Sequence, residues 1–195
     1  MQRVPSYLGD SWISLTVALA IFSGGSVVQA AEFSNTQARL EEALGDLQSP
    51  DSFIRQRAFL RLEALRDPSS IDAIRSHLND KDADTRAFSL RALAAVQGAS
   101  AIPTLLNALQ KDPNPTARRA ALFGLEPLQE HDPTILPAFI QALKDRKPEV
   151  RIVAVDVVSR IDKPQAKQAL LERKHREHNH DVRRVLTQAL VRAGA

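Results

Sequence analysis

The sequence of 195 residues contains no cysteine, and its only tryptophan and tyrosine, Trp12 and Tyr7, lie close to the N-terminus. Without cysteine the chain forms no disulfide bond and has neither a thiol nucleophile nor a thiolate metal ligand. It also lacks a glycine-rich phosphate loop, a serine nucleophile in a tight glycine turn and a paired carboxylate motif. Nucleic-acid binding is not expected, because it requires stronger basicity and stacking aromatic residues. We therefore expect neither enzymatic activity nor a bound cofactor.

The formal net charge of +3 is unevenly distributed along the chain. Residues 31–140 contain 12 Lys and Arg against 15 Asp and Glu, a net charge of −3, whereas residues 141–195 contain 13 against 7, a net charge of +6. The C-terminal third is therefore a weakly basic end of an otherwise nearly neutral chain.

Residues 1–30 have the pattern of a secretory signal peptide. A short polar stretch precedes an apolar run from Trp12 to Phe22, and Val28 and Ala30 occupy the two positions that a signal peptidase reads. We predict cleavage after Ala30 or nearby, and export of the remaining chain to the periplasm, the thylakoid lumen or the extracellular space without stable membrane insertion. An uncleaved membrane anchor is the alternative, although the apolar run has only about half of the roughly 20 residues of a spanning helix.

One arginine recurs through the rest of the chain at intervals of 31 to 33 residues, as Arg55, Arg86, Arg118, Arg151 and Arg183. The positions three, seven and ten residues after each arginine are small or apolar, as in Ala121, Leu125 and Leu128 after Arg118. These spacings follow one face of an α-helix. Each arginine is therefore expected near the start of an amphipathic helix.

The residues four positions before the arginines predict where these helices begin. They are Asp51, Asp82, Asn114, Lys147 and Asn179, and all but the lysine are good N-cap residues. At Lys147, the following Pro148 and Glu149 are expected to compensate for the missing cap. A shorter helix is expected before each of these second helices, near residues 36–47, 70–79, 101–110, 133–144 and 164–177.

The predicted fold is all-α: an α-solenoid of five helical hairpins, about ten helices, that follows the signal peptide. One hairpin cannot bury its apolar stripe alone, whereas five stacked hairpins can. The repeat domain is expected to cover residues 31–195, with repeats at approximately 34–66, 67–98, 99–130, 131–162 and 163–195.

The third repeat carries a family resemblance. Its segments AIPTLLNALQKD (residues 101–112) and ARRAALFGL (residues 117–125) resemble a HEAT repeat, and the short period resembles the HEAT-like subtype of phycobilisome lyases. In that family an acidic residue in the turn and the arginine of the next helix form a stacked ladder between repeats. The resemblance assigns the five recurring arginines to this ladder together with the acids six positions before them, which are Asp80, Asp112, Asp145 and Glu177. Ser49 holds this place in the first repeat, so the ladder is expected to end there.

Two further readings of these residues concern small ligands. The arginine series is open to interpretation as a phosphate-binding stripe, although an arginine beside an acid favours a structural ion-pair network. His175, His178 and His180 lie within six residues of one another, and they are either metal ligands or part of a solvated turn. Some HEAT-like proteins are di-iron hydroxylases with His-Glu ligand pairs, but none of the five histidines here precedes a glutamate.

The leading functional hypothesis is an exported HEAT-repeat scaffold that binds a protein partner through its concave face. The second helices line that face, and the positions one, five and eight after each ladder arginine should be exposed. Arg91, Arg119 and Phe123 are the predicted partner-binding patch, because aromatic residues and arginine dominate interfaces. The alternative is a chromophore-attachment factor or lyase subunit of the bilin lyase type. The sequence leaves the partner and the oligomeric state open.

Overall fold

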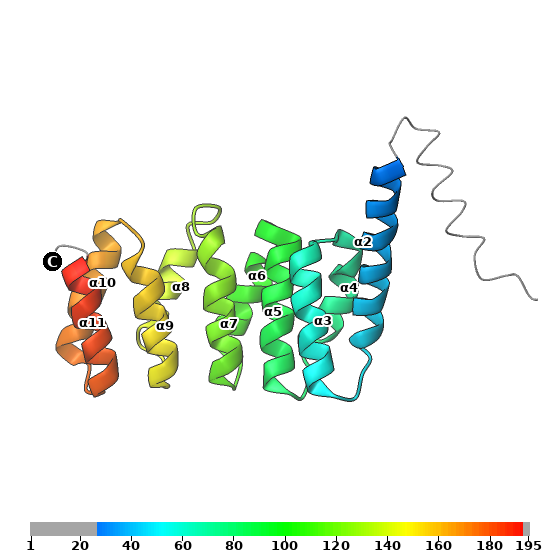
Figure 1. Ribbon diagram of the computed structural model, residues 1–195. Coiled ribbons are helices and arrows are strands. Elements are labelled where there is room, and N and C mark those ends of the chain that lie inside the picture. The colour runs from blue at the N-terminus through cyan, green and yellow to red at the C-terminus, as the bar shows by residue number, and fades with distance from the viewer. Residues whose placement is uncertain (1–26, 193–195) are drawn as a thin grey trace, which may run out of the picture.

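The computed structural model describes residues 27–192, with side chains from residue 31 onward, and every regular element in this range is helical. The helices follow one another in five pairs arranged side by side in a row, with the second helix of each pair in one layer (Figure 1). The first helices are α2 (Val27–Asp46), α4 (Ile71–Ser76), α6 (Ile102–Lys111), α8 (Ile135–Ala142) and α10 (Pro164–Arg176). The second helices are α3 (Ser52–Leu65), α5 (Ala83–Gln97), α7 (Pro115–Leu125), α9 (Pro148–Ser159) and α11 (His180–Arg192).

The second helices begin at the residues that the capping pattern predicts. The side chains of Asp51, Asp82, Asn114 and Asn179 each accept a hydrogen bond from a backbone N–H in the first turn that follows. Lys147 makes no such bond, and its helix starts with Pro148, whose missing N–H would be unpaired in any case. The predicted starts of all five second helices are therefore confirmed.

The first helices differ from prediction in their ends. Helix α2 begins at Val27, nine residues before the expected start, because no glycine or proline interrupts residues 27–44. Helix α4 is shorter than the expected 70–79, because residues 77–80 continue it only as tight turns, with His77 N–H bonded to the carbonyl of Ile74. A 3₁₀ turn leads into α4 at Pro68–Ser70 and into α6 at Gly98–Ala101. A third, Glu126–Leu128, follows α7.

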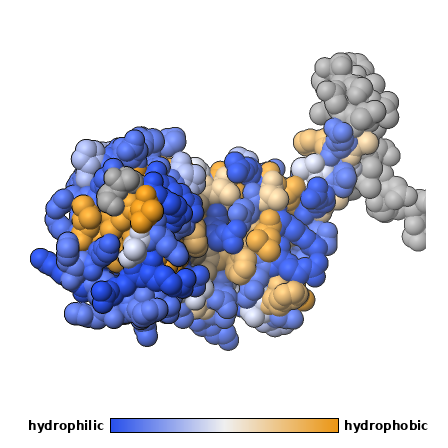
Figure 2. Space-filling model, turned by 60° about the vertical axis from the view of Figure 1, so that its left-hand side comes forward, coloured by the Kyte–Doolittle hydropathy of each residue, from blue (hydrophilic) through white to orange (hydrophobic). Residues whose placement is uncertain are grey.

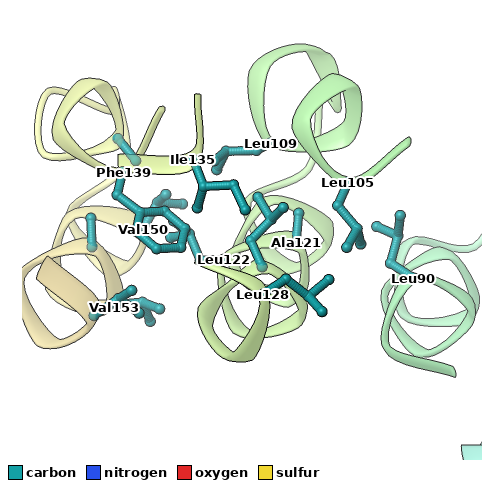
Figure 3. Packing of buried hydrophobic residues seen from close by; sticks show 14 of the residues in the cluster. Leu90, Leu105, Leu109, Ala121, Leu122, Leu128, Ile135, Phe139, Val150 and Val153 are labelled. Atoms are coloured by element: carbon teal, nitrogen blue, oxygen red, sulfur yellow. The ribbon is translucent and has the colours of Figure 1, made fainter. Parts of the chain in front are cut away.

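The core lies between the two helix layers and runs along the whole row. Leu105 and Leu109 of α6, Ala121 and Leu122 of α7, and Phe139 of α8 meet there in the centre of the molecule (Figure 3). The stripe three, seven and ten positions after each arginine is buried as predicted in the third and fourth repeats. Gly124 suits the close approach of the helices, since a Cβ at this position would lie 3.2 Å from the Cβ of Ala94, a tight contact.

The predicted signal peptide falls almost entirely on residues 1–26, outside the described residues, and the predicted cleavage point at Ala30 lies within α2. Within the described residues, one helical stretch, Ala83–Lys111, is long and apolar enough to span a membrane by length and composition. This stretch consists of α5, the 3₁₀ turn Gly98–Ala101 and α6, and the two helices contribute Leu93 and Leu105 to the buried core. Its apolar character is therefore explained by packing within the row of helices.

Candidate functional site

The recurring arginines form a ladder of ion pairs that connects successive repeats. Arg86 donates from Nε and Nη2 to the two carboxylate oxygens of Asp112, at 2.8 and 2.9 Å. Arg118 binds Asp145 in the same two-bond geometry, at 2.8 Å for both bonds. Arg151 binds Glu177 in this way as well, at 2.8 and 2.9 Å. Paired bonds of this kind are the strong form of an arginine–carboxylate contact.

The pairing of the ladder differs in one respect from the family resemblance. Each carboxylate contacts the arginine of the preceding repeat. At Asp80, Asp112 and Asp145, the arginine six residues later donates instead to the backbone carbonyl of the acid. Arg118, for example, donates from Nη1 to the Asp112 carbonyl at 2.9 Å. The carboxylate is turned away because one of its oxygens accepts from the backbone N–H two residues later, as Asp112 does from Asn114 at 2.8 Å. Each acid therefore shapes its own turn and also ties down the repeat before it.

Three of the ladder acids, Asp112, Asp145 and Glu177, are held in their ionised form. Burial raises the pKa of Asp112, but hydrogen bonds from Arg86 and from the Asn114 N–H outweigh it, so the pKa lies below its usual value. Asp145 has a lowered pKa by the same balance, with Arg118 as the principal donor. Glu177 is desolvated by burial as well, yet hydrogen bonds from Arg151, the Asn179 N–H and Arg173 lower its pKa to about 2. Arg86, Arg118 and Arg151 are thus neutralised within the fold, which leaves the phosphate-stripe interpretation without support at these three positions.

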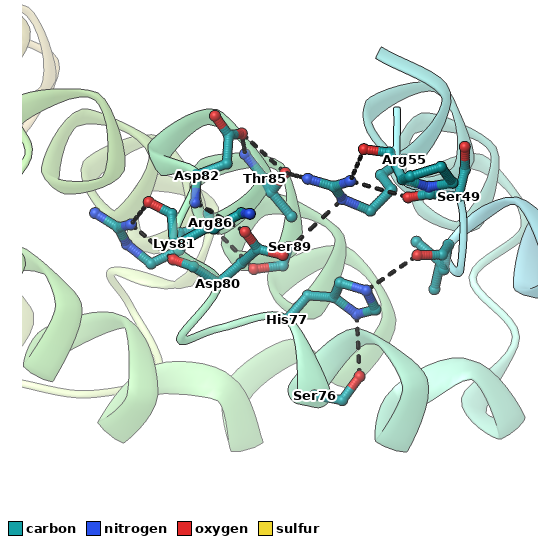
Figure 4. A network of polar contacts seen from close by, with 12 residues as sticks. Ser49, Arg55, Ser76, His77, Asp80, Lys81, Asp82, Thr85, Arg86 and Ser89 are labelled. Carbon is teal, nitrogen blue, oxygen red and sulfur yellow. Dashed lines mark hydrogen bonds and ion pairs between the residues drawn. The ribbon is translucent and has the colours of Figure 1, made fainter. Parts of the chain in front are cut away.

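The two ends of the ladder depart from this geometry. Arg55 contacts Asp80 only at 3.9 Å and donates instead to the hydroxyl of Thr85 and the carbonyl of Ser49 (Figure 4). Arg183 is exposed, and no carboxylate within residues 27–192 lies in contact with it. The ladder proper therefore consists of three two-bond rungs, one loose rung at its start and an open arginine at its end.

A groove lies where the C-terminal ends of α3, α5 and α7 meet. Its volume is about 570 Å³, and Arg91 and Phe123 of the predicted patch both line it. Phe123 is 43 % exposed. Arg91 is held by Glu63 of the preceding repeat, at 3.1 Å, and by the ring of Phe88, 5.8 Å from its guanidinium carbon. The groove therefore combines an exposed aromatic ring with a positioned arginine.

Arg119 does not belong to this groove, and its predicted exposure is wrong. Its side chain is half-buried, and its Nε is buried without a hydrogen-bond partner among the described residues. The corresponding Ala87 is buried as well. Because α7 is flanked by α5 and α9 in the same layer, the position one after the arginine is covered by a neighbouring helix. The structure therefore brings together two of the three predicted patch residues.

Sequence reasoning missed most of the polar rim of the groove. Glu63 stands eight positions after Arg55, a position expected to be exposed, but its pairing with Arg91 depends on how adjacent repeats stack. Arg66 lines the groove from the end of α3, where its φ of 53° gives it a left-handed conformation. No sequence signal marks an arginine for this conformation, which glycine and asparagine adopt more readily.

The histidines provide no metal centre within the described residues, where no group of three His, Cys, Asp or Glu side chains is arranged to hold an ion. His175, His178 and His180 are exposed around the start of α11. His77 connects the first two repeats. Its Nε2 lies 3.1 Å from the carbonyl of Leu47, and its ring meets that of Phe59 edge-on at 5.5 Å.

Comparison with known proteins places these features in context. The chain is 43 % identical over 53 residues to the phycobilisome maturation protein of Synechococcus elongatus, and this match spans 27 % of the chain and about a quarter, 26 %, of the relative. Its fold is similar to the complex of CpcE and CpcF of phycocyanin lyase from Nostoc, with a TM-score of 0.65, 21 % identity and coverage of 78 % of this chain and 98 % of that one. An engineered protein has a similar fold, with a TM-score of 0.52, 17 % identity and coverage of 95 % and 91 %.

These similarities contradict the expectation that the chain has no enzymatic role, because one of the matched structures is a phycocyanin lyase complex. That expectation relied on the absence of known catalytic motifs from the sequence. The pattern of HEAT repeats matches residues 38–126 and 102–191, which together cover most of the sequence. The chain therefore belongs to the HEAT-repeat family.

Proposed function

We propose that this protein is a bilin lyase-type factor that assists chromophore attachment to a phycobilisome protein, as a subunit that works with a protein partner. The observation that carries the proposal is the 53-residue segment shared at 43 % identity with a phycobilisome maturation protein. The similarity of fold to the two-protein CpcE and CpcF complex supports the need for a partner. This role replaces the independent scaffold as the leading hypothesis.

The groove between α3, α5 and α7 is the part of the molecule best suited to this role. Phe123, Pro127 and Leu128 offer an apolar wall. Arg66 offers positive charge beside it, and Arg91 lines the groove together with its partner Glu63. A bilin is a flat, largely apolar molecule with carboxylate side chains, so it requires both features at once. The ion pair between Arg91 and Glu63 holds one guanidinium in place at the rim, which reduces the entropy lost on binding.

The proposal is tested by reconstituting chromophore attachment in vitro. The purified chain, phycocyanobilin and an apo-phycobiliprotein subunit are combined with a candidate partner lyase subunit, and covalently bound bilin is measured by its absorbance after denaturation. We expect attachment to exceed that of the mixture without this chain. Phe123→Ala should lower the yield at least tenfold, whereas Phe53→Ala, at an exposed phenylalanine remote from the groove, should not. Equal attachment with and without the chain would reject the proposal.

An exported protein-binding scaffold is the second candidate, and the apolar run from Trp12 to Phe22 favours it. The two candidates predict different locations, because bilin attachment to phycobilisome proteins occurs in the cytoplasm. N-terminal sequencing of the protein from fractionated cells distinguishes them. A start at Ala31 or nearby in an exported fraction favours the scaffold, whereas an intact N-terminus in the cytoplasmic fraction favours the lyase-type factor.

A further inference from the structure

The C-terminal end of the row of helices is an exposed surface with a distinct composition. Helices α10 and α11 pack on α8 and α9 on one side, and their other side faces away from the row (Figure 1). Figure 2, in which this end comes forward, shows hydrophobic atoms surrounded by hydrophilic ones. Val191 of α11 belongs to this end and is 72 % exposed. The end helices therefore present an apolar centre with a polar border.

The paired arginines of the ladder indicate which chemical group this surface would bind. Arg86, Arg118 and Arg151 stand at one helical position, and each is covered by the next repeat, whose acid binds it through two hydrogen bonds. Arg183 stands at the same position of α11 but is exposed, without a carboxylate contact in the described part of the chain. The helical position from which three other repeats bind a carboxylate is thus repeated at the end of the row. Arg86, Arg118 and Arg151 are also anchored through Nη1 to the carbonyl six residues before them, and among the described residues Arg183 makes no such bond.

The charge around Arg183 favours an acidic contact. A shallow hollow of about 620 Å³ is lined by His178, His180, Arg183, Arg184, Thr187 and Gln188, and no acid lines it. The nearby Glu177 is buried and already binds Arg151 and Arg173, so it does not neutralise the hollow. Asp181 lies 3.6 Å from Arg184 and offsets only part of this charge.

We infer that this end docks a second helical-repeat protein. The turn between the two helices of that protein's first repeat would present an Asp or Glu to Arg183, as the turns with the ladder acids do within this chain. A second copy of this chain does not fit in head-to-tail order, because Ser49 holds the acid's position in the first repeat. The Ser49 hydroxyl accepts from the Asp51 N–H, and a hydroxyl offers no second oxygen for a two-bond contact with arginine. The inference does not depend on chromophore attachment.

Site-specific photo-crosslinking in cells that naturally produce the protein tests this docking. A photoreactive amino acid replaces Thr187 beside Arg183, and a control probe replaces the exposed Asp72 on α4. The crosslinked peptide should come from another helical-repeat protein, within a few residues of an Asp or Glu that precedes a helix. Arg183→Glu should reduce this crosslink at least tenfold, whereas Arg57→Glu, at an exposed arginine of α3, should leave it unchanged.

Several results of this experiment would overturn the inference. They are a crosslink to a second copy of the chain, to a protein without helical repeats, to nucleic acid or to lipid. The absence of any crosslink at position 187 would overturn it as well, and so would a crosslink that persists in Arg183→Glu. Because the readout is the crosslinked residue, it is independent of lyase activity.

A second measurement tests the chemistry of the open end without any unknown partner. A copy of residues 131–162 is appended after Ala195, which places the copied Asp145 27 residues after Arg183, the separation of Arg118 and Asp145. The extended protein should melt at a higher temperature than the natural chain, as measured by circular dichroism. Arg183→Gln should lower the melting temperature of the extended protein and leave that of the natural chain unchanged. An extended protein that is insensitive to Arg183→Gln would reject the proposed contact.

Discussion

The last paired rung of the ladder and its first rung are built from the same sequence pattern but differ in geometry. Arg151 makes two short hydrogen bonds to Glu177, and both side chains are nearly inaccessible to solvent. Arg55 approaches Asp80 only to 3.9 Å, and its Nε is buried without a hydrogen-bond partner among the described residues. A recurring residue pair therefore does not guarantee a recurring interaction energy.

Thr85 accounts for this difference between the rungs. Its hydroxyl accepts from Nη2 of Arg55 at 3.1 Å, and Nη2 is the donor that meets the second carboxylate oxygen in the other rungs. The same hydroxyl donates to the N-cap Asp82 at 2.9 Å, so it is fixed in this place. The first rung is thus one hydrogen bond from the guanidinium to an uncharged hydroxyl, next to a loose ion pair. This combination is weaker than a two-bond contact with a carboxylate.

The largest change in stability that this comparison predicts comes from replacing Glu177. Glu177→Ala leaves Arg151 buried without its carboxylate and should lower the free energy of unfolding by about 3–5 kcal/mol. Asp80→Ala removes a loose pair and the acceptor for the Asp82 N–H, and it should cost about 1–2 kcal/mol. Glu172→Ala, at an exposed acid of α10, is the control and should change stability by less than about 0.5 kcal/mol. Urea denaturation measures all three, and equal losses at Glu177 and Asp80 would show that the rungs are equivalent.

The next largest change in stability is expected at acidic pH, which should weaken the two-bond rungs. The pKa of Glu177 is about 2 in the folded protein against an ordinary value of 4.5, so the folded state favours its ionised form. The resulting stabilisation is fully present above about pH 4.5 and is lost as the pH falls toward about 2. The lowered pKa values of Asp112 and Asp145 act in the same direction.

Glu177→Gln separates this contribution from the rest of the acid response. The variant does not titrate at position 177, so its free energy of unfolding should fall less steeply than that of the wild type between about pH 4.5 and pH 2. Urea midpoints measured through this range give the two slopes. Parallel slopes would mean that Glu177 has the same pKa in the folded and unfolded states.

Helix capping distinguishes the start of α7 from the start of α9, and its expected effect on stability is smaller. Helices α7 and α9 both start with a proline, after Asn114 and Lys147 respectively, but only the asparagine caps its helix. Lys147→Asn should therefore stabilise the protein by about 1 kcal/mol, because its side chain gains the N–H of Glu149 as a donor. Asn114→Lys should cost a similar amount. Thermal unfolding measures both, and a loss of stability in Lys147→Asn would show that Asp145 alone completes this turn.

The sequence predicted the features that depend on local spacing and left open those that depend on neighbours. The N-caps Asp51, Asp82, Asn114 and Asn179 act within one turn of their own helix, and the second helices begin where they indicate. The burial of Arg119 depends on α5 and α9, which flank its helix, and was therefore missed. The groove is a further case, because Glu63, Arg91 and Phe123 come from three repeats, and only their stacking brings them together.

The smallest predicted effect isolates the ladder contact from the turn at Asp80. The carboxylate of Asp80 accepts from the Asp82 N–H at 2.8 Å, and an asparagine side chain retains this acceptor. Asp80→Asn therefore removes only the attraction to Arg55 across 3.9 Å, and it should cost less than about 0.5 kcal/mol. Asp112→Asn also retains the acceptor for its turn, but its amide nitrogen cannot accept a hydrogen bond. A charged two-bond contact with Arg86 is therefore replaced by at most one bond to an uncharged oxygen, which should cost about 1–3 kcal/mol. Urea denaturation of these two variants compares the loose rung directly with a two-bond rung. Equal losses of unfolding free energy would mean that the acids contribute to stability only through the turns that they cap, and not through their contacts with arginine.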